Sequence, residues 1–195
     1  MNVARRVLGS TATRIALAAT LAAGMFLGAT AARASSFKDG QRLVGVTVGL
    51  GGLAGAYGDA SSPVLGLEYD QAINPEWSVG GILGHTSSHY HANYLGTAWG
   101  WDYGYTIIGA RGAYHFAKQI KDPRLDAYVG ATLGYDVVSA SYNGPTGIPY
   151  GSASSSYMLF GIHGGGRYDM SNKWGLQGEL GFGIGYLSLG AYMRL

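Results

Sequence analysis

The sequence contains no cysteine, few charged residues and, after residue 34, no sustained helical period, and each shortage excludes a class of protein. Without cysteine, the chain forms neither disulfides nor thiolate metal sites. Charged residues make up only 12% of the chain, which is too few to cover the surface of a soluble barrel. The lack of a helical period leaves an all-β domain as the prediction.

The N-terminus has the three parts of an export signal. Arginines precede an uncharged, apolar stretch at residues 15–32, and an Ala-Arg-Ala sequence follows at once. Small residues at the two positions that a signal peptidase reads predict cleavage between Ala34 and Ser35. The apolar stretch is also just long enough to be an uncleaved membrane helix. We expect residues 1–34 to be a cleaved signal peptide and residues 35–195 to form one domain.

Removal of the signal would reverse the net charge. The whole chain has 13 basic and 11 acidic residues, but four of the arginines precede Ser35 and all of the acids follow it. The nine remaining basic residues and eleven acids give a net charge of −2. The basic character therefore belongs to the signal, and we expect no nucleic-acid partner and no cofactor.

Alternation of period two runs through the rest of the chain, interrupted by clusters of Gly, Asn, Asp, Ser and Pro. It predicts eight strands, an even number as in single-chain bacterial barrels. Connections after the second, fourth and sixth strands are short, whereas those after the first, third and fifth are long and polar. We expect the short ones to face the periplasm and the long ones the outside. The predicted strands are residues 42–50, 63–71, 77–86, 101–116, 124–138, 154–169, 174–183 and 186–195.

Each predicted strand has an aliphatic face and a mixed face, because successive side chains point to opposite sides. In the first strand, Val44, Val46 and Val48 lie opposite Gly45 and Thr47. The mixed face also carries charges of both signs, which must pair or hydrate inside a barrel because lipid cannot hold them. The pattern predicts an eight-stranded antiparallel up-and-down transmembrane β-barrel. Its predicted interior charges are Glu68, Arg111, Asp126, Arg167, Glu179 and Arg194, with Gln177 beside them.

A soluble barrel of the lipocalin type is the structural alternative, because it alternates too, with its apolar face inward. The low charge content argues against it, and so does a clustering of aromatic residues at both ends of the strands, as in interfacial girdles. One girdle would lie beside the short turns, at Tyr69, Trp77, Tyr114, Phe116, Tyr168 and Trp174. The other would lie toward the long loops, at Tyr90, Tyr94, Trp99, Trp101, Tyr103 and Tyr157.

The last eight residues resemble the signal by which outer-membrane barrels are handed to the barrel-assembly machinery. That pattern has a polar residue, a glycine and two apolar residues near the end, and its matches here are Ser188, Gly190, Met193 and Leu195. The pattern more often ends in an aromatic residue than in leucine. The match predicts the assembly machinery as a partner during biogenesis.

Three hairpins extend this resemblance to nearly all of residues 41–195. With the C-terminal signal, the hairpins at residues 67–80, 128–135 and 165–181 resemble the small outer-membrane β-barrel superfamily, which includes opacity-type surface antigens and the OmpX, OmpA and OmpW barrels. The resemblance implies a place in the outer membrane of a Gram-negative cell, in contact with lipopolysaccharide and phospholipid. It implies little about activity, because the shared residues build the wall.

Two polar groups could carry chemistry. His85 and Ser87 share a strand face, as a base and a nucleophile would, and they resemble the His-x-Ser pair of outer-membrane lipid A deacylases. That family has Asn after the serine and carries the pair on a late strand, so we favour a polar strand end. His85, His89 and His91 are residue types that bind zinc or nickel. Loop histidines are usually solvated, so we expect no metal and no catalytic residue.

The interior charges could line a pore or form a plug, and we favour a plug because eight strands leave little lumen. Function would then reside in the outer loops, as adhesion, surface antigenicity or envelope integrity. Two alternatives remain: a narrow channel for small apolar solutes, which would need a lateral opening, and a lipid A-modifying enzyme. Candidate contacts to a surface ligand, or interfacial anchors, are Tyr90, Tyr94, Trp99, Tyr142 and Tyr150.

Overall fold

Nine strand elements follow the period-two pattern of the sequence. The structure is a computed structural model, and it describes residues 38–51, 60–94, 97–116, 118–143, 152–182 and 184–195. The two-residue β2 pairs with β4 directly beyond β3, so β2 and β3 act as one interrupted strand. The elements are β1 (Arg42–Leu50), β2 (Ala60–Ser61), β3 (Val64–Asn74), β4 (Trp77–Tyr94), β5 (Thr97–His115), β6 (Leu125–Asn143), β7 (Ala153–Asp169), β8 (Trp174–Phe182) and β9 (Leu187–Arg194).

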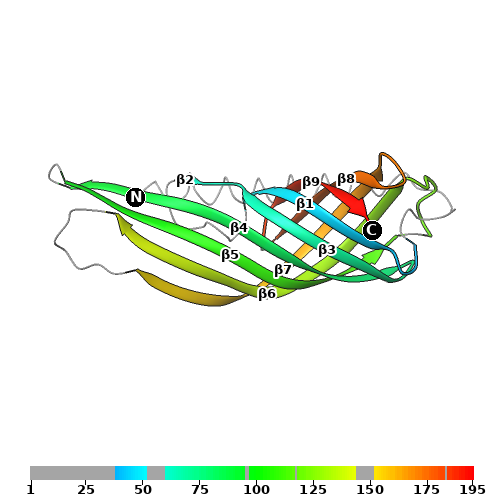
Figure 1. Ribbon diagram of the computed structural model, residues 1–195, viewed down its shortest axis with the longest axis horizontal. Helices are drawn as coiled ribbons and strands as arrows, with labels where there is room; N and C mark the ends of the chain where they lie inside the picture. The colour runs from blue at the N-terminus through cyan, green and yellow to red at the C-terminus, as the bar shows by residue number, and fades with distance from the viewer. Residues whose placement is uncertain (1–37, 52–59, 95–96, 117, 144–151, 183) are drawn as a thin grey trace, which may run out of the picture.

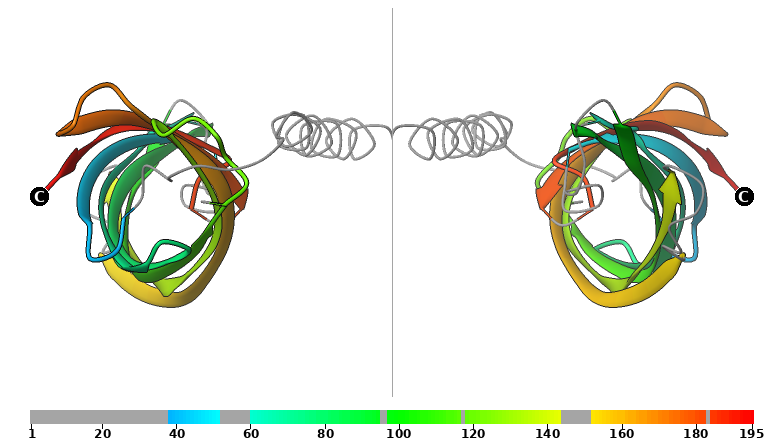
Figure 2. Two further views of the ribbon diagram at one scale, coloured as in Figure 1. Left: turned by 90° about the vertical axis from the view of Figure 1, so that its right-hand side faces the viewer. Right: turned by 90° about the vertical axis from the view of Figure 1, so that its left-hand side faces the viewer.

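All neighbouring strands pair antiparallel, and the β1–β9 and β4–β5 pairings complete a ring (Figure 2). The ring contains eight strands, as predicted. Among the described residues, no helix is both long and apolar enough to cross a membrane. The predicted signal peptide, with Ala34 and Ser35, lies outside the described residues.

The strands differ greatly in length. β1 and β8 have 9 residues each and β9 has 8, whereas β4, β5, β6 and β7 have 18, 19, 19 and 17. A transmembrane strand needs about 9–11 residues. The four long strands therefore continue beyond the others, by roughly 20 Å at the usual rise and tilt. Figure 1 shows this side of the barrel reaching far past β1, β8 and β9.

The outer ends predicted for three of these strands were wrong. The prediction ended one strand at residue 86, began the next at residue 101 and ended the third at residue 138. The structure extends β4 to Tyr94, begins β5 at Thr97 and ends β6 at Asn143. The β4–β5 ladder runs without a shift from Trp77↔Tyr114 to Tyr94↔Thr97. This ladder satisfies the backbone polar groups of a segment whose Ser, Gly and Asn content is typical of a loop.

The outer surface of the ring carries a broad apolar band. Its large side chains are exposed on all sides of the barrel, as Leu65, Ile108 and Phe160 illustrate with exposures of 62%, 58% and 58%. In water such a continuous surface would be unfavourable, whereas lipid solvates it. At the end with the short turns, Tyr69, Trp77 and Trp174 are exposed on the same surface. The band has the character of a lipid-facing wall.

The predicted girdle toward the long loops was wrong. Tyr90, Trp101 and Tyr103 share the strand faces of the buried Ser88 and Tyr105, so they point inward. Trp99 and Tyr157 also lie on inward faces, and the side chain of Tyr94 is outside the described residues. The outward aromatic side chains at this end of the band are Tyr135, Phe160 and Phe182.

Inward glycines make room for the largest inward side chains. A Cβ at Gly165 would lie 2.9 Å from Cζ of Tyr128 and 2.8 Å from Cγ of Glu179. A Cβ at Gly175 would collide with the ring of Tyr192. The glycines of the mixed face therefore leave the space that large side chains occupy inside the barrel.

Candidate functional site

A network of charged side chains crosses the lumen in the half of the barrel near the short turns. Its carboxylates and guanidiniums are supplied by β3, β5, β6, β7, β8 and β9, since in each strand they occupy positions of the inward face. The ring therefore brings together groups that are up to 109 positions apart in the sequence. The members are Glu68, Asp70, Arg111, Asp126, Arg167, Asp169, Gln177, Glu179 and Arg194.

Arg111 is the most connected cation of the network. Its Nη1 lies 3.0 Å from Oε2 of Glu68, and its Nε lies 3.5 Å from Oδ1 of Asp70. Its Nη2 donates to Oε1 of Glu179 and lies 3.1 Å from Nε2 of His163. One guanidinium thus joins three carboxylates from two strands, and its removal would leave them without their common counter-charge.

Arg167 forms a second centre, which shares Asp70 with the first. Its Nη2 donates to Oδ2 of Asp70, its Nε donates to Oε1 of Gln177 at 3.3 Å, and its Nη1 lies 4.0 Å from Oδ2 of Asp126. The guanidinium also lies over the ring of Tyr128, with Cζ 4.6 Å from the centroid. Asp70 therefore couples the two arginine centres into one network.

Neutral donors complete the network. The hydroxyl of Tyr128 donates to Oε1 of Glu179 at 2.7 Å, and the amide of Gln177 donates to Oε2 of Glu68 at 2.8 Å. Such hydrogen bonds satisfy carboxylate oxygens that the arginines do not reach. For side chains that are buried, this saturation is what makes the charges tolerable.

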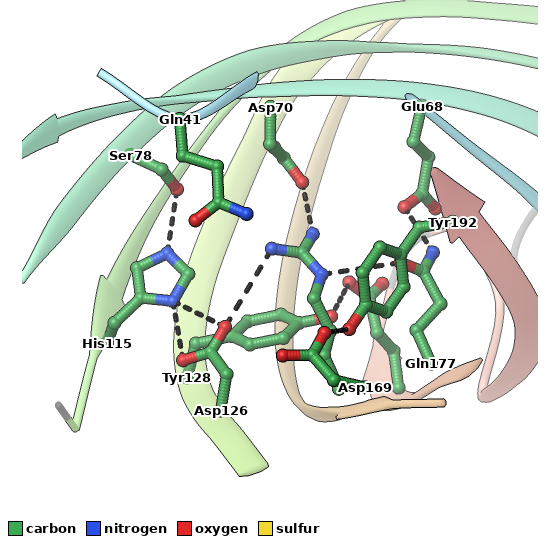
Figure 3. Close-up of polar contacts among 12 residues, drawn as sticks. Gln41, Glu68, Asp70, Ser78, His115, Asp126, Tyr128, Asp169, Gln177 and Tyr192 are labelled. Atoms are coloured by element: carbon green, nitrogen blue, oxygen red, sulfur yellow. Dashed lines mark hydrogen bonds and ion pairs between the residues drawn. The ribbon is translucent and has the colours of Figure 1, made fainter. Parts of the chain in front are cut away.

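Two smaller groups close the end of the lumen near the short turns (Figure 3). Nδ1 of His115 lies 3.0 Å from each carboxylate oxygen of Asp126, and its Nε2 lies 2.9 Å from Oγ of Ser78. Asp169 accepts hydrogen bonds from the Tyr192 hydroxyl and from Arg194. These contacts fix side chains from five strands across the opening.

Above the charged network, apolar side chains fill the lumen. Val64, Ile107 and Leu159 form a buried cluster, and Ile184 from the β8–β9 connection packs against it. Between this cluster and the charges lies a cavity of about 30 Å³, which is room for about one water molecule. The described lumen is therefore occupied by side chains at two levels, charged near the short turns and apolar above them.

The structure places all six predicted interior charges inside the barrel and shows how they pair. Glu68 and Glu179 share Arg111, whereas Arg167 pairs with aspartates and Arg194 pairs with Asp169. The prediction missed several members: Asp70, Asp169, His115 and His163. Strand parity could have found them, since each lies an even number of positions from a predicted interior residue on its strand.

His85 and Ser87 lie on the outward face of β4, beside the upper edge of the apolar band. Nδ1 of His85 lies 3.2 Å from Oγ1 of Thr106, and Oγ of Ser87 lies 3.2 Å from Oγ of Ser62. Each side chain therefore contacts a hydroxyl from another strand or segment. The arrangement is that of a polar strand surface, and among the described residues no acid is hydrogen-bonded to His85.

His89 and His91 lie on the same outward face, with ring centroids 6.4 Å apart. Nδ1 of His89 lies 2.6 Å from Oδ1 of Asp102 on β5. Within the part of the chain that the structure describes, no three His, Cys, Asp or Glu side chains come together to hold a metal ion.

The predicted C-terminal signal lies on β9 and the residue after it: Ser188 and Gly190 face inward, and Met193 and Leu195 are exposed outward.

The outer parts of the long strands form what we call the projecting sheet: residues 86–94 of β4, 97–106 of β5, 137–143 of β6 and 153–157 of β7. Its outward face is polar and includes Ser87, His89, His91, Asp102, Ser139 and Ser141. Its inward face, which we call the aromatic face, carries Tyr90, Trp99, Trp101, Tyr103, Tyr105, Tyr142 and Tyr157. Such a sheet suits water on its outer side and a ligand or partner on its inner side.

No family model matches this sequence, and no curated protein does either. Among solved structures, the chain is similar to the N-terminal β-barrel domain of Pseudomonas aeruginosa OprF, with 13% identity, 80% of this chain and 98% of that chain covered, and a TM-score of 0.50. It is also similar to Ail of Yersinia pestis in complex with the heparin analogue sucrose octasulfate, with 16% identity, coverage of 80% and 95%, and a TM-score of 0.47. The OprF domain shows the fold that the two share. Together with the apolar band, this fold is that of a small membrane-spanning β-barrel.

Proposed function

We propose that this protein is a non-enzymatic outer-membrane protein that presents its projecting sheet for interaction at the cell surface, while the barrel is a closed anchor. The observation that carries the proposal is the length of β4 to β7, which exceeds what a membrane requires. The sheet becomes polar on its outward face where the apolar band ends. Residues on a rigid projection of this kind are well placed for recognition.

The contents of the lumen support anchoring over transport. Charged pairs occupy one half, and Val64, Ile107, Leu159 and Ile184 occupy the other. A channel for small apolar solutes would need an apolar path with a lateral opening. The lumen near the short turns is instead lined by paired charges, which disfavours such a path.

The placement of the His85 and Ser87 pair supports a non-enzymatic role. The pair lies on the outward face, and Ser87 contacts Ser62 rather than His85. A nucleophile needs a base within hydrogen-bond reach and a group that orients the base.

Two partners follow from this proposal. Lipid of the outer membrane would surround the apolar band, and the assembly machinery would recognise the C-terminal residues Met193 and Leu195.

The experiment compares cells that produce the whole chain with cells that produce a trimmed form. In the trimmed form, residues 88–103 are replaced by Asn-Gly, which forms a tight turn between the paired Ser87 and Gly104. Heat-modifiable gel mobility verifies that both forms are folded barrels. We expect cells with the whole chain to attach to glass and to matrix-coated surfaces several-fold more than cells with the trimmed form. Equal attachment of the two would contradict the proposal.

A further inference from the structure

Asp136 differs from every other buried carboxylate of the barrel. Glu68, Asp70, Asp126, Asp169 and Glu179 each contact an arginine or histidine. Asp136 is 92% buried, at 8% exposure, and its Oδ1 has no hydrogen-bond partner among the described residues. An ionised carboxylate in that position is unfavourable unless a cation reaches it.

The strand register shows what surrounds Asp136. It pairs with Ile107 on β5 and with Tyr157 on β7, so these two side chains are its direct neighbours on the inward face. On β5, the next lumen-facing residue toward the tip of the projecting sheet is Tyr105. On β7, the next lumen-facing residue toward the charged network is Leu159. The carboxylate thus lies above the apolar cluster and between two tyrosines, at the inner edge of the aromatic face.

Among the described residues, no lysine or arginine pairs with Asp136. Residues 43–110, 125–166 and 174–193 contain neither, and these three ranges include every connection on this side of the barrel. All basic residues of the domain lie at Arg111, at Arg167 or nearer the short turns. His85, His89 and His91 are on the outward face, and His163 contacts Arg111. The described residues therefore supply no counter-charge, and a bound ligand could supply it.

We propose that the inner edge of the aromatic face binds a small organic ammonium ion, with Asp136 as its counter-charge and Tyr157 and Tyr105 as its aromatic wall. The diffuse charge of a quaternary or protonated amine is attracted by the faces of aromatic rings. A divalent metal requires several oxygen ligands, and no such group exists among the described residues. Anionic ligands are excluded by the lack of basic residues.

The remaining aromatic residues extend the site outward. Trp101 pairs with Tyr90 on β4 and with Tyr142 on β6, and the rings of Trp101 and Tyr142 lie 5.4 Å apart in an edge arrangement. These rings form a path from the tip of the projecting sheet toward Asp136. The inference adds a ligand class to the aromatic face and does not depend on the attachment role proposed above.

The test uses protein purified from outer membranes in a maltoside, because phosphocholine and amine-oxide detergents carry the very group in question. Choline and tetramethylammonium chloride are titrated, and amide NMR shifts of Asp136 and Tyr157 are followed. Sodium chloride controls for ionic strength, and 3,3-dimethyl-1-butanol is the neutral analogue of choline. The variants are Asp136→Asn and Tyr157→Leu, and Asp102→Asn on the outward face is the matched control.

We expect saturable shifts with both ammonium ions and none with the alcohol. Affinity should fall about tenfold or more in Asp136→Asn, fall less in Tyr157→Leu and stay unchanged in Asp102→Asn. Circular dichroism and heat-modifiable mobility establish that each variant is folded. Equal binding by Asp136→Asn, equal binding of the alcohol, or no saturable shift in the wild type would each overturn the inference. Attachment of whole cells would be unaffected by any of these results, so the two proposals fail separately.

Discussion

The membrane barrel and the projecting sheet are built from the same strands, but their polar and apolar faces are exchanged. Along β5, the inward residue Arg111 is charged and the outward residue Ile108 is apolar within the barrel. Further along the same strand, Trp101 faces inward and Asp102 faces outward. The period of two continues without a shift, so the backbone is the same in both regions. What changes is the medium on the outer side, from lipid to water.

The two regions also differ in how their polar groups are satisfied. Inside the barrel, charges are held by one another, because Arg111 and Arg167 each contact several acceptors. On the outward face of the projecting sheet, water can satisfy Ser87, His89 and their neighbours. Substitutions in the first region should therefore change stability, and those in the second should change recognition.

The largest effect is expected for Arg111→Met. The variant leaves Glu68, Glu179 and Asp70 without their shared cation, and breaking a buried ion pair in this way costs about 3–5 kcal/mol. Urea unfolding in lipid vesicles, followed by tryptophan fluorescence, measures the loss. Arg124→Met, in an exposed turn, is the control and should change little. Equal stability of the two variants would mean that the network does not hold the barrel together.

A smaller loss is expected for Tyr128→Phe. The change removes the hydroxyl that donates to Glu179 at 2.7 Å and keeps the ring beneath Arg167. A hydrogen bond to a charged group contributes about 1.5–3 kcal/mol. The same unfolding experiment applies, with Tyr157→Phe on the aromatic face as the matched control. A greater loss in Tyr157→Phe would mean that the hydroxyl of Tyr157, and not that of Tyr128, stabilises the barrel.

Two aspartates sharpen the comparison further. Asp70→Asn weakens contacts to both arginine centres and should lower the free energy of unfolding by about 2 kcal/mol. Asp136→Asn removes a carboxylate that has no hydrogen bond to its Oδ1 among the described residues, so we expect no loss and at most a small gain. Unfolding midpoints of the two variants, measured side by side, give the answer. A loss in Asp136→Asn as large as that in Asp70→Asn would show that Asp136 is paired.

The smallest effect on stability is expected from trimming the β4–β5 hairpin. Replacement of residues 88–103 removes only the projecting part and leaves the charged network intact, so the unfolding midpoint should stay the same. The trimmed barrel should also retain its heat-modifiable mobility. A clear drop in the midpoint would show that the projecting sheet contributes to the core of the barrel.

Much of the barrel could be predicted from the sequence because residues of a membrane-spanning strand alternate strictly between lipid and lumen. Alternation placed Val46 outward and Glu68 inward, and all eight strands were found. The ends of β4, β5 and β6 could not be predicted, because a Ser, Gly and Tyr composition is compatible with both a loop and a sheet in water. The aromatic residues were assigned to a girdle for the same reason: the prediction assumed that the membrane boundary lay at the strand ends.

The charged network was predicted in outline and not in its pairings. Strand parity brings Arg167 and Asp70 to the same lumen, but only the register around the whole ring places them in contact. Asp136 also had inward parity, yet the lack of a partner for its Oδ1 among the described residues depends on what the other seven strands present at its level. These contacts are set only when the ring closes, and no local sequence pattern specifies which residues then meet.

The most direct test of the exchange of faces is a scan of nitroxide labels along β5. The chain has no cysteine, so single cysteines at Ala110, Ile108, Thr106, Gly104 and Asp102 label one outward position each. Accessibility to oxygen and to a water-soluble nickel complex is then compared for the protein in lipid vesicles. We predict that oxygen dominates at Ala110 and Ile108 and the nickel complex at Gly104 and Asp102, with the crossover near Thr106. Preference for oxygen continuing to Asp102, or for nickel already at Ala110, would contradict the account.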